Sequence, residues 1–384
     1  MTYGTDDRTS TEPARHVAVY VTNHGFGHIN RVVAVLDQLP ESVRITVRAD
    51  PEVREALEQR LNRPFGFGSF PSDRGTASPP GQNSRTDIPA TFEKLEDRLR
   101  EIDRASASEV RWLREAGVSA VYADASVRPM ALAAQAGIPA YLAANFTWDE
   151  IYSDLLSRAN SAEIPDESRP ALSSLVDRMR EDCREATLLR CWPHTPMRGI
   201  GRTAIDVGLV VNPARDVRDE ILKKFSLAAE SKLIYFYVGR YGVEELAWDR
   251  LETLPPEFVF IGLHPPGRDL PGRFFTLDPS EFNGADLLRS CDAAVVKAGY
   301  GAVAEAMSAG TPVIYPPRVG FVEFDFLDQA LRGWSGGVPI SEEDFASLDL
   351  ITVLEAAVKG RAEPPDVPVD GAARIAKLLS HDSD

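Results

Sequence analysis

The sequence is poor in cysteine and has no long apolar run. Its 384 residues include three cysteines, an odd number without metal-ligand spacing, which favours free thiols in a reducing compartment. No apolar run reaches the roughly 18 residues of a membrane-spanning helix. Residues 1–14 form a polar leader, expected to be disordered, without the apolar core of a signal peptide. We therefore expect a cytoplasmic protein with no stable membrane insertion.

Positive charge is also scarce. There are 42 Lys and Arg against 58 Asp and Glu, which gives a formal net charge of −16. An acidic surface repels phosphate backbones, so we expect no nucleic-acid partner. Hydrophobic residues make up 43%, an ordinary share for a globular protein, and the length exceeds what one core normally supports. The composition therefore predicts two folded domains.

Apolar strands and amphipathic helices alternate along the chain, which is typical of doubly wound parallel sheets. In the first half, strands are expected at residues 16–22, 44–48, 120–123 and 140–144, and helices at 29–39, 51–60, 91–116, 129–136, 148–159 and 170–186. Residues 66–90 are rich in Gly, Pro and Ser and predict a long loop. In the second half, strands are expected at 206–211, 232–238, 258–262, 292–296 and 313–315, and helices at 302–309 and 371–379.

The sequence thus predicts an α/β protein with two Rossmann-like, doubly wound parallel-sheet domains that face a central cleft. The first domain is expected at residues 15–205 and the second at 206–365, followed by a linker and helix at 366–384. Ligands of such sheets bind beyond the carboxyl ends of the strands, so the cleft is the expected site.

The sharpest motif is a glycine turn in the second half, Lys-Ala-Gly-Tyr-Gly, where a strand gives way to a helix. Glycines let a ligand approach the backbone, and the first N–H groups of a helix favour an anion. We expect Gly299, Tyr300 and Gly301 to bind a diphosphate through their backbone, helped by Lys297. Glu305, about one helical turn further on, would bind ribose hydroxyls. An ordinary turn with a solvated glutamate would explain the same pattern.

A second glycine turn, Asn-His-Gly-Phe-Gly-His, follows the first predicted strand and opens a helix. Histidines suit proton transfer near neutral pH, so His24 and His28 are candidate bases. Gly25 and Gly27 would contact the ligand. Asp124, at another strand end, would orient a histidine or act as a base, although a capping role fits equally well. The spacing does not match a zinc motif, so no metal is expected.

Two further loops follow predicted strands. Gly239 would offer a backbone N–H, and Arg240 would clamp a phosphate; an ordinary loop is the alternative. Asn145, Trp148 and Asp149 combine an aromatic face with amide and carboxylate groups, which is typical of sugar contacts. We expect these three to bind the acceptor, although Trp148 fits a core position equally well.

The segment GYGAVAEAMSAGTPVIYPP, followed by VEFDFLDQ, resembles the donor-site signature of GT-B glycosyltransferases. The resemblance implies that the glycine pair contacts a diphosphate and that Glu305 binds the ribose. It further implies that the donor sugar is bound by Glu323, with Asp325 or Gln329 beside it. The turn HGFGHINR resembles the glycine-rich loop of the acceptor-side domain in these enzymes.

The chain also resembles the N-terminal, transferase-like half of plant L-arabinokinases. The segments YVTNHGFGHINRV, ANFTWDEIY and KAGYGAVAEA recur there in the same order, over roughly residues 16–335. The kinase half has no counterpart in this sequence, so sugar kinase activity is not implied.

These features predict a glycosyltransferase that moves a sugar from a nucleotide sugar, preferably a UDP-sugar, to an acceptor hydroxyl. Family resemblance implies inversion of the anomeric centre. No cofactor or metal is expected beyond the nucleotide-sugar co-substrate. Two alternatives remain open: a nucleotide-sugar hydrolase or 2-epimerase, and a sugar-nucleotide-binding module without catalysis.

Overall fold

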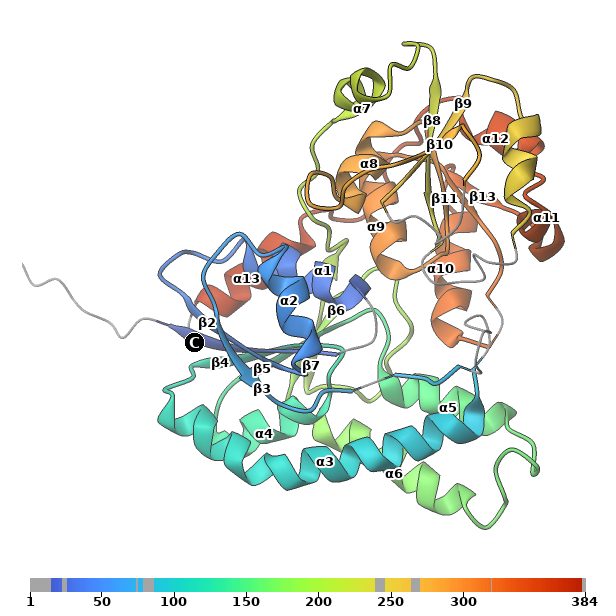
Figure 1. The fold of residues 1–384 in the computed structure, drawn as a ribbon. Coiled ribbons are helices and arrows are strands. Elements are labelled where there is room, and N and C mark those ends of the chain that lie inside the picture. The colour runs from blue at the N-terminus through green and yellow to red at the C-terminus, as the bar shows by residue number, and fades with distance from the viewer. Residues whose placement is uncertain are drawn as a thin grey trace, which may run out of the picture.

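A computed structural model describes residues 15–22, 26–73, 75–78, 86–238, 246–263, 270–318 and 320–381. These residues form two α/β domains, each built on a parallel sheet, with seven strands in the first sheet and six in the second (Figure 1). The predicted fold class is confirmed. Within the same ranges, no helix has the length and apolar character needed to cross a membrane.

The first sheet has the strand order β3-β2-β1-β4-β5-β6-β7. Its strands are β1 (His16–Val21), β2 (Arg44–Ala49), β3 (Gly66–Ser69), β4 (Ala120–Asp124), β5 (Ala140–Ala144), β6 (Thr187–Cys191) and β7 (Thr203–Gly208). Its helices are α1 (Phe26–Leu36), α2 (Glu52–Glu58), α3 (Ile88–Glu115), α4 (Arg128–Ala136), α5 (Trp148–Arg158) and α6 (Arg169–Asp182).

The central strand β1 is buried on both faces, as its continuous apolar sequence requires. Val17, Val19 and Val21 pack in the core with α1 and α2. Ala18 and Tyr20 point to the opposite face, into the core formed with α3 to α6. Helices therefore cover both faces of the sheet, and only the strand ends are left to form a site (Figure 1).

The second sheet has the strand order β10-β9-β8-β11-β12-β13. Its strands are β8 (Lys232–Tyr237), β9 (Phe258–Gly262), β10 (Phe274–Thr276), β11 (Ala293–Val296), β12 (Val313–Tyr315) and β13 (Gly337–Pro339). Its helices are α7 (Arg218–Lys224), the 3-10 helix η2 (Trp248–Thr253), α8 (Gly284–Ser290), α9 (Tyr300–Ala309), α10 (Val322–Arg332), α11 (Glu342–Ser347) and α12 (Ile351–Ala357).

The last helix, α13 (Gly371–Ser380), returns to the first domain and packs against α1 and β7 (Figure 1). Two backbone hydrogen bonds join Leu209 to the segment that leads into α13. The N–H of Leu209 donates to the carbonyl oxygen of Pro368, and its carbonyl oxygen accepts from the N–H of Gly371. Gly208 has a φ of 80°, and a Cβ there would lie 2.2 Å from the carbonyl oxygen of Pro368. A glycine is therefore required where the chain leaves the first domain.

Two boundaries differ from the sequence-based expectation. The proposed boundary at residue 205 falls inside β7, which pairs with β6 in the first sheet, so this sheet extends to Gly208. The predicted loop at 66–90 begins with the edge strand β3, which pairs with β2. Both segments are edge strands in which most side chains are partly or fully exposed, so their apolar patterns are weak.

Candidate active site

The glycine turn of the first domain places a histidine against a buried aspartate. His28 lies in the first turns of α1, and Asp124 is the last residue of β4, which is paired with β1. The Nδ1 atom of His28 lies 2.7 Å from Oδ1 of Asp124. An ionised carboxylate only accepts hydrogen bonds, so Nδ1 carries the hydrogen and Nε2 keeps the lone pair. His28 can therefore accept a proton at Nε2.

Asp124 is fully buried and shares its carboxylate with Arg31. Arg31 donates to both oxygens of Asp124: its Nε donates to Oδ2, and its second terminal nitrogen lies 2.9 Å from Oδ1. Burial alone would raise the pKa of Asp124, but the charge of Arg31 and the bond from His28 outweigh it, so the pKa is lowered. Asp124 is thus held as a carboxylate.

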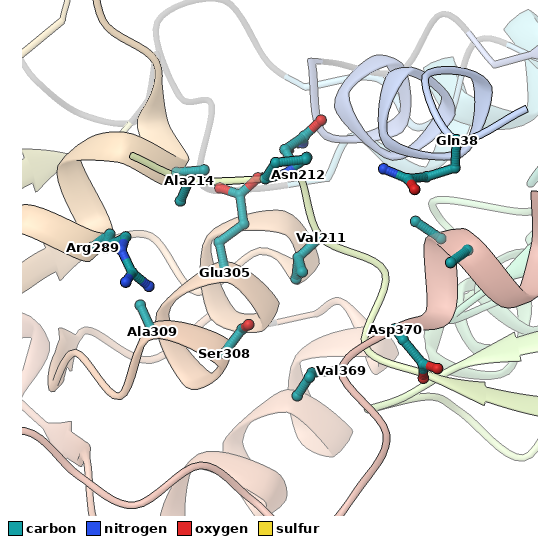
Figure 2. Close-up of a pocket in the computed structure, with 14 residues that line it drawn as sticks. Gln38, Val211, Asn212, Ala214, Arg289, Glu305, Ser308, Ala309, Val369 and Asp370 are labelled. Atoms are coloured by element: carbon teal, nitrogen blue, oxygen red, sulfur yellow. Dashed lines mark hydrogen bonds between the residues drawn. The ribbon is translucent and has the colours of Figure 1, made fainter. Parts of the chain in front are cut away.

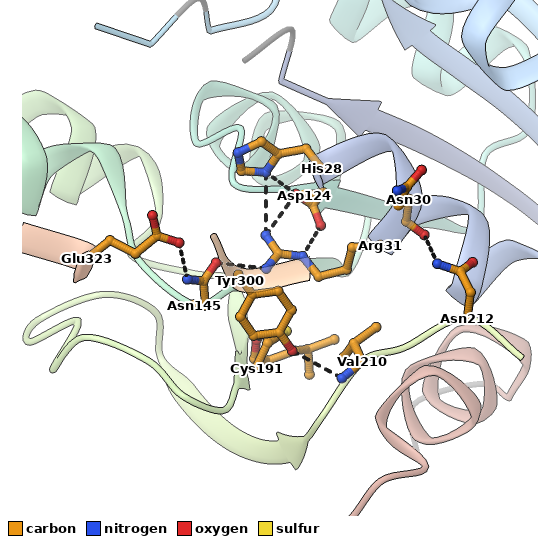
Figure 3. Close-up of polar contacts among 11 residues, drawn as sticks. His28, Asn30, Arg31, Asp124, Asn145, Cys191, Val210, Asn212, Tyr300 and Glu323 are labelled. Atoms are coloured by element: carbon orange, nitrogen blue, oxygen red, sulfur yellow. Dashed lines mark hydrogen bonds and ion pairs between the residues drawn. The ribbon is translucent and has the colours of Figure 1, made fainter. Parts of the chain in front are cut away.

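The two domains meet beside the ion pair of Arg31 and Asp124 (Figure 3). Asn145, which follows β5, accepts from Arg31 at 2.8 Å and donates to Oε1 of Glu323 at 2.7 Å. Glu323 lies in the first turn of α10 in the second domain. The guanidinium of Arg31 also lies over the ring of Tyr300, the first residue of α9, at 4.8 Å from its centroid. Polar contacts therefore run unbroken from His28 to the second domain.

The second glycine turn faces the first. A Cβ built on Gly301 would lie 4.0 Å from the Cα of Gly27. Gly299 precedes α9 in an extended conformation and provides no side-chain cap, and the first N–H groups of a helix have no acceptor within the helix. These amides, together with the positive end of the helix dipole, favour an anion at this position, next to the turn that carries His28.

Two cationic side chains lie near the start of α9. Lys297 directly follows β11, and Arg318 follows the neighbouring strand β12. Burial and the charge of Arg318 lower the pKa of Lys297 to about 7, against the opposing effect of Glu323. Arg318 lies 3.8 Å from Glu323. A basic site thus exists within an acidic chain, and an anion bound there would relieve the repulsion between the two cations.

Glu305 lies on α9 and faces a cavity of about 310 Å³ between the domains (Figure 2). Its Oε1 accepts from Nδ2 of Asn212 at 3.1 Å, and Asn212 also donates to the carbonyl oxygen of Asn30 at 3.3 Å. Burial raises the pKa of Glu305 to about 7, and Asn212 only partly opposes this shift. The carboxylate is therefore oriented, and it is ready to accept further hydrogen bonds when ionised.

Comparison with known proteins places this geometry in context. No protein-family model matches the chain. An L-arabinokinase of Arabidopsis thaliana is 28% identical over 354 residues, which cover 89% of this chain and 32% of that protein. The chain thus spans about a third of the length of this relative.

Solved structures of glycosyltransferases share the two-domain architecture. The glycosyltransferase VinC in complex with dTDP has a TM-score of 0.58 and 15% identity, covering 95% of this chain and 94% of that one. A UDP-glucosyltransferase from Polygonum tinctorium has a TM-score of 0.59 and 14% identity, covering 97% and 94%. The chain has the GT-B glycosyltransferase fold.

On this GT-B framework, two of the expected acceptor contacts are not available in the structure. Trp148 is 0% exposed and stacks on Tyr152 with ring centroids 5.8 Å apart. Asp149 is 1% exposed and pairs with Arg180 at 2.9 Å. Both side chains point into the core of the first domain, so neither can contact an acceptor. Asn145 reaches the cleft, but it contacts Glu323 there.

The residues expected to bind the donor sugar lie on different faces of α10. Glu323 points toward the first domain, whereas Asp325 and Gln329 lie on the exposed face of α10. Residues two apart on a helix point in nearly opposite directions, which explains the difference. His24, Gly25, Gly239 and Arg240 lie outside the described residues, and their roles stay predictions. Among the residues described, no group of three His, Cys, Asp or Glu is arranged to hold a metal ion.

Three side chains of the GT-B cleft were not anticipated from the sequence. Arg31 lies one helical turn after His28, and this spacing could have indicated that both face Asp124. Arg318 follows a strand at its carboxyl end, a position that favours ligand contact. Asn212 lies in the segment between the domains, and no sequence pattern there indicates its contact with Glu305.

Proposed function

We propose that the protein is a glycosyltransferase that transfers a sugar from a nucleoside-diphosphate sugar to an acceptor hydroxyl. The observation that carries this proposal is the His28–Asp124 pair opposite the glycine start of α9. A proton acceptor on one domain thus faces an anion-binding helix start on the other. A module that only bound nucleotides would have no use for the paired histidine.

In the proposed reaction, Nε2 of His28 takes the proton of the acceptor hydroxyl as its oxygen attacks the anomeric carbon. The bond from that carbon to the diphosphate oxygen breaks, and the nucleoside diphosphate leaves. The N–H groups that begin α9, with Lys297 and Arg318, would stabilise the leaving charge without a metal. A single displacement of this kind inverts the anomeric centre.

The remaining contacts would position the donor. Glu305 would accept hydrogen bonds from ribose hydroxyls, and Glu323 from hydroxyls of the donor sugar. Uracil or thymine is the proposed base of the nucleotide, because one structural neighbour is named a UDP-glucosyltransferase and another was solved with dTDP. We favour UDP.

A nucleotide screen tests the proposal. The full chain is titrated with UDP, dTDP and GDP and with UDP-glucose, and the melting temperature is followed. At 100 times its Kd a nucleotide should stabilise the fold by about 2.7 kcal/mol. Nucleoside diphosphate release is then measured with and without a panel of hydroxyl acceptors. Release that requires an acceptor supports transfer, equally fast release without one indicates hydrolysis or epimerisation, and no binding by any nucleotide refutes the proposal.

The pH dependence of donor binding should separate Glu305 from Lys297. Glu305 loses its charge as pH falls through about 7, whereas Lys297 gains its charge over the same range. UDP-glucose carries no phosphate group that titrates here, so the protein alone sets the slope. In Lys297→Met, affinity should fall by about tenfold from pH 8 to pH 6, as the ionised fraction of Glu305 does. In Glu305→Gln, affinity should rise over the same interval. Parallel slopes in calorimetry would contradict both assignments.

A further inference from the structure

Arg31 is the centre of the contacts between the domains. Its side chain is 3% exposed, and it binds Asp124 with two nitrogens. Its remaining terminal nitrogen donates to Asn145, and its plane lies over Tyr300. One guanidinium therefore contacts the partner of the proposed base, the first residue of α9 and a residue that reaches α10.

Asn145 links Arg31 to Glu323 in a defined direction. Arginine only donates hydrogen bonds, and a carboxylate only accepts them, so the side-chain oxygen of Asn145 must face Arg31 and its nitrogen must face Glu323. The amide of Asn145 thus links the charged groups of Arg31 and Glu323 through one hydrogen bond to each. A carboxylate at position 145 has no hydrogen to donate to Glu323, so it would not satisfy both neighbours.

A ligand bound at Glu323 should therefore change the proton affinity of His28. A sugar hydroxyl that donates to Glu323 competes with the amide of Asn145 for the same carboxylate. Asn145 is then less polarised, and Arg31 directs more of its charge toward Asp124. Since Asp124 is shared between Arg31 and His28, the proton affinity of His28 should change with it.

We propose that Arg31 and Asn145 are positioning residues that couple binding of a donor sugar at Glu323 to the His28–Asp124 pair. The role of this coupling in catalysis rests on the proposed function. The hydrogen bonds that carry it are present in the structure without a ligand. It would adjust the base only when the sugar, and not the nucleotide alone, is bound.

The charged groups linked to the His28–Asp124 pair come from both domains. Among the residues that the structure describes, Arg31 on α1 contacts both His28 and Asp124, and Glu323 on α10 is linked to Arg31 through Asn145. Arg318 lies 3.8 Å from Glu323. The neighbouring side chains of β4, β6 and α9 stay neutral at physiological pH, because burial raises their pKa values; they are Tyr122, Cys191 and Tyr300.

A double-mutant cycle on the free protein tests the coupling. Histidine carbons are labelled, and the midpoint of the His28 titration is followed by NMR. Glu323→Gln removes a negative charge, so it should lower this midpoint by about 0.4 pH units or more in the wild-type background. In the Asn145→Ala background the shift should nearly vanish. Should Asn145→Ala fail to fold, Asn145→Leu fills the same volume and breaks the same two bonds.

Asn212 provides a matched control. It also crosses between the domains, from Asn30 to Glu305, but does not touch Arg31. In Asn212→Ala, the effect of Glu323→Gln on His28 should persist. An equal midpoint shift in the Asn145→Ala and wild-type backgrounds would overturn the proposal, because the effect would then be through-space electrostatics alone.

A ligand arm separates this inference from the proposed function. The negative charge of either nucleotide should raise the His28 midpoint in both backgrounds, and the glucose of UDP-glucose should lower it relative to UDP in the wild type. That lowering by the sugar should be reduced in Asn145→Ala. If neither compound binds, the proposed function fails while the free-protein cycle still decides the coupling. If both bind and give the same midpoint in the wild type, the coupling is refuted and the function stands.

Discussion

Replacing His28 with glutamine should lower turnover by about 10²–10⁴-fold while leaving nucleotide affinity within about twofold, the loss expected when a positioned general base is removed. Glutamine keeps a side-chain donor for Asp124 but has no group that accepts a proton near neutral pH. The nucleotide contacts proposed for Glu305 and Lys297 lie on the other domain and are unchanged. Steady-state transfer kinetics together with calorimetry of UDP would measure both quantities.

His381 supplies the control for this comparison. It is an exposed histidine at the end of α13, and its Nδ1 contacts the carbonyl oxygen of Lys377. His381→Gln should keep wild-type kcat and KM. If His28→Gln retained full turnover, another group would have to act as the base, and the role assigned to the His28–Asp124 pair would be abandoned.

Replacing Asp124 with asparagine should destabilise the protein by about 3–5 kcal/mol, because it leaves the buried charge of Arg31 without its counter-ion. At roughly 2–4 °C per kcal/mol for a domain of this size, the melting temperature should fall by about 6–20 °C. Activity should fall as well, because His28 loses the carboxylate that fixes its tautomer. Calorimetric unfolding would give the first number.

A double variant distinguishes the two roles of Asp124. Removing both charges, in Arg31→Met with Asp124→Leu, should recover most of the lost stability, since an apolar pair often replaces a buried ion pair at little cost. Transfer activity should not recover. An unchanged melting temperature in Asp124→Asn would show that the pairing contributes nothing to stability.

Much of the architecture could be read from the sequence, because buried parallel strands are continuous apolar runs. The strand at His16–Val21 and the short strand before Lys297 are of this kind, and the glycine turns after them mark where helices begin. The assignment of residues 206–208 failed for a physical reason. An edge segment with a weak apolar pattern does not specify which of two sheets it joins, and only pairing with β6 decides it.

The candidate site was partly predictable for the same reason. Residues at strand ends must gather at one edge of a sheet, which brings His28 and Asp124 together. Trp148 follows a strand too, yet its ring packs inward, since an aromatic side chain satisfies a core position as well as a ligand contact. The contact of Asn145 with Glu323 joins residues 178 positions apart, and no local pattern encodes it.

The two chain segments that cross between the domains are bonded to each other at Leu209 and Pro368. Because these two segments lie side by side, they act as a single hinge, and neither resists rotation of the domains about the line that joins them. The covalent chain therefore tethers the halves but leaves their angle to non-covalent forces. Side-chain contacts between the halves, among them Asn145 with Glu323 and Arg31 with Tyr300, then fix the angle. A ligand that competes for such contacts would therefore change the opening between the domains.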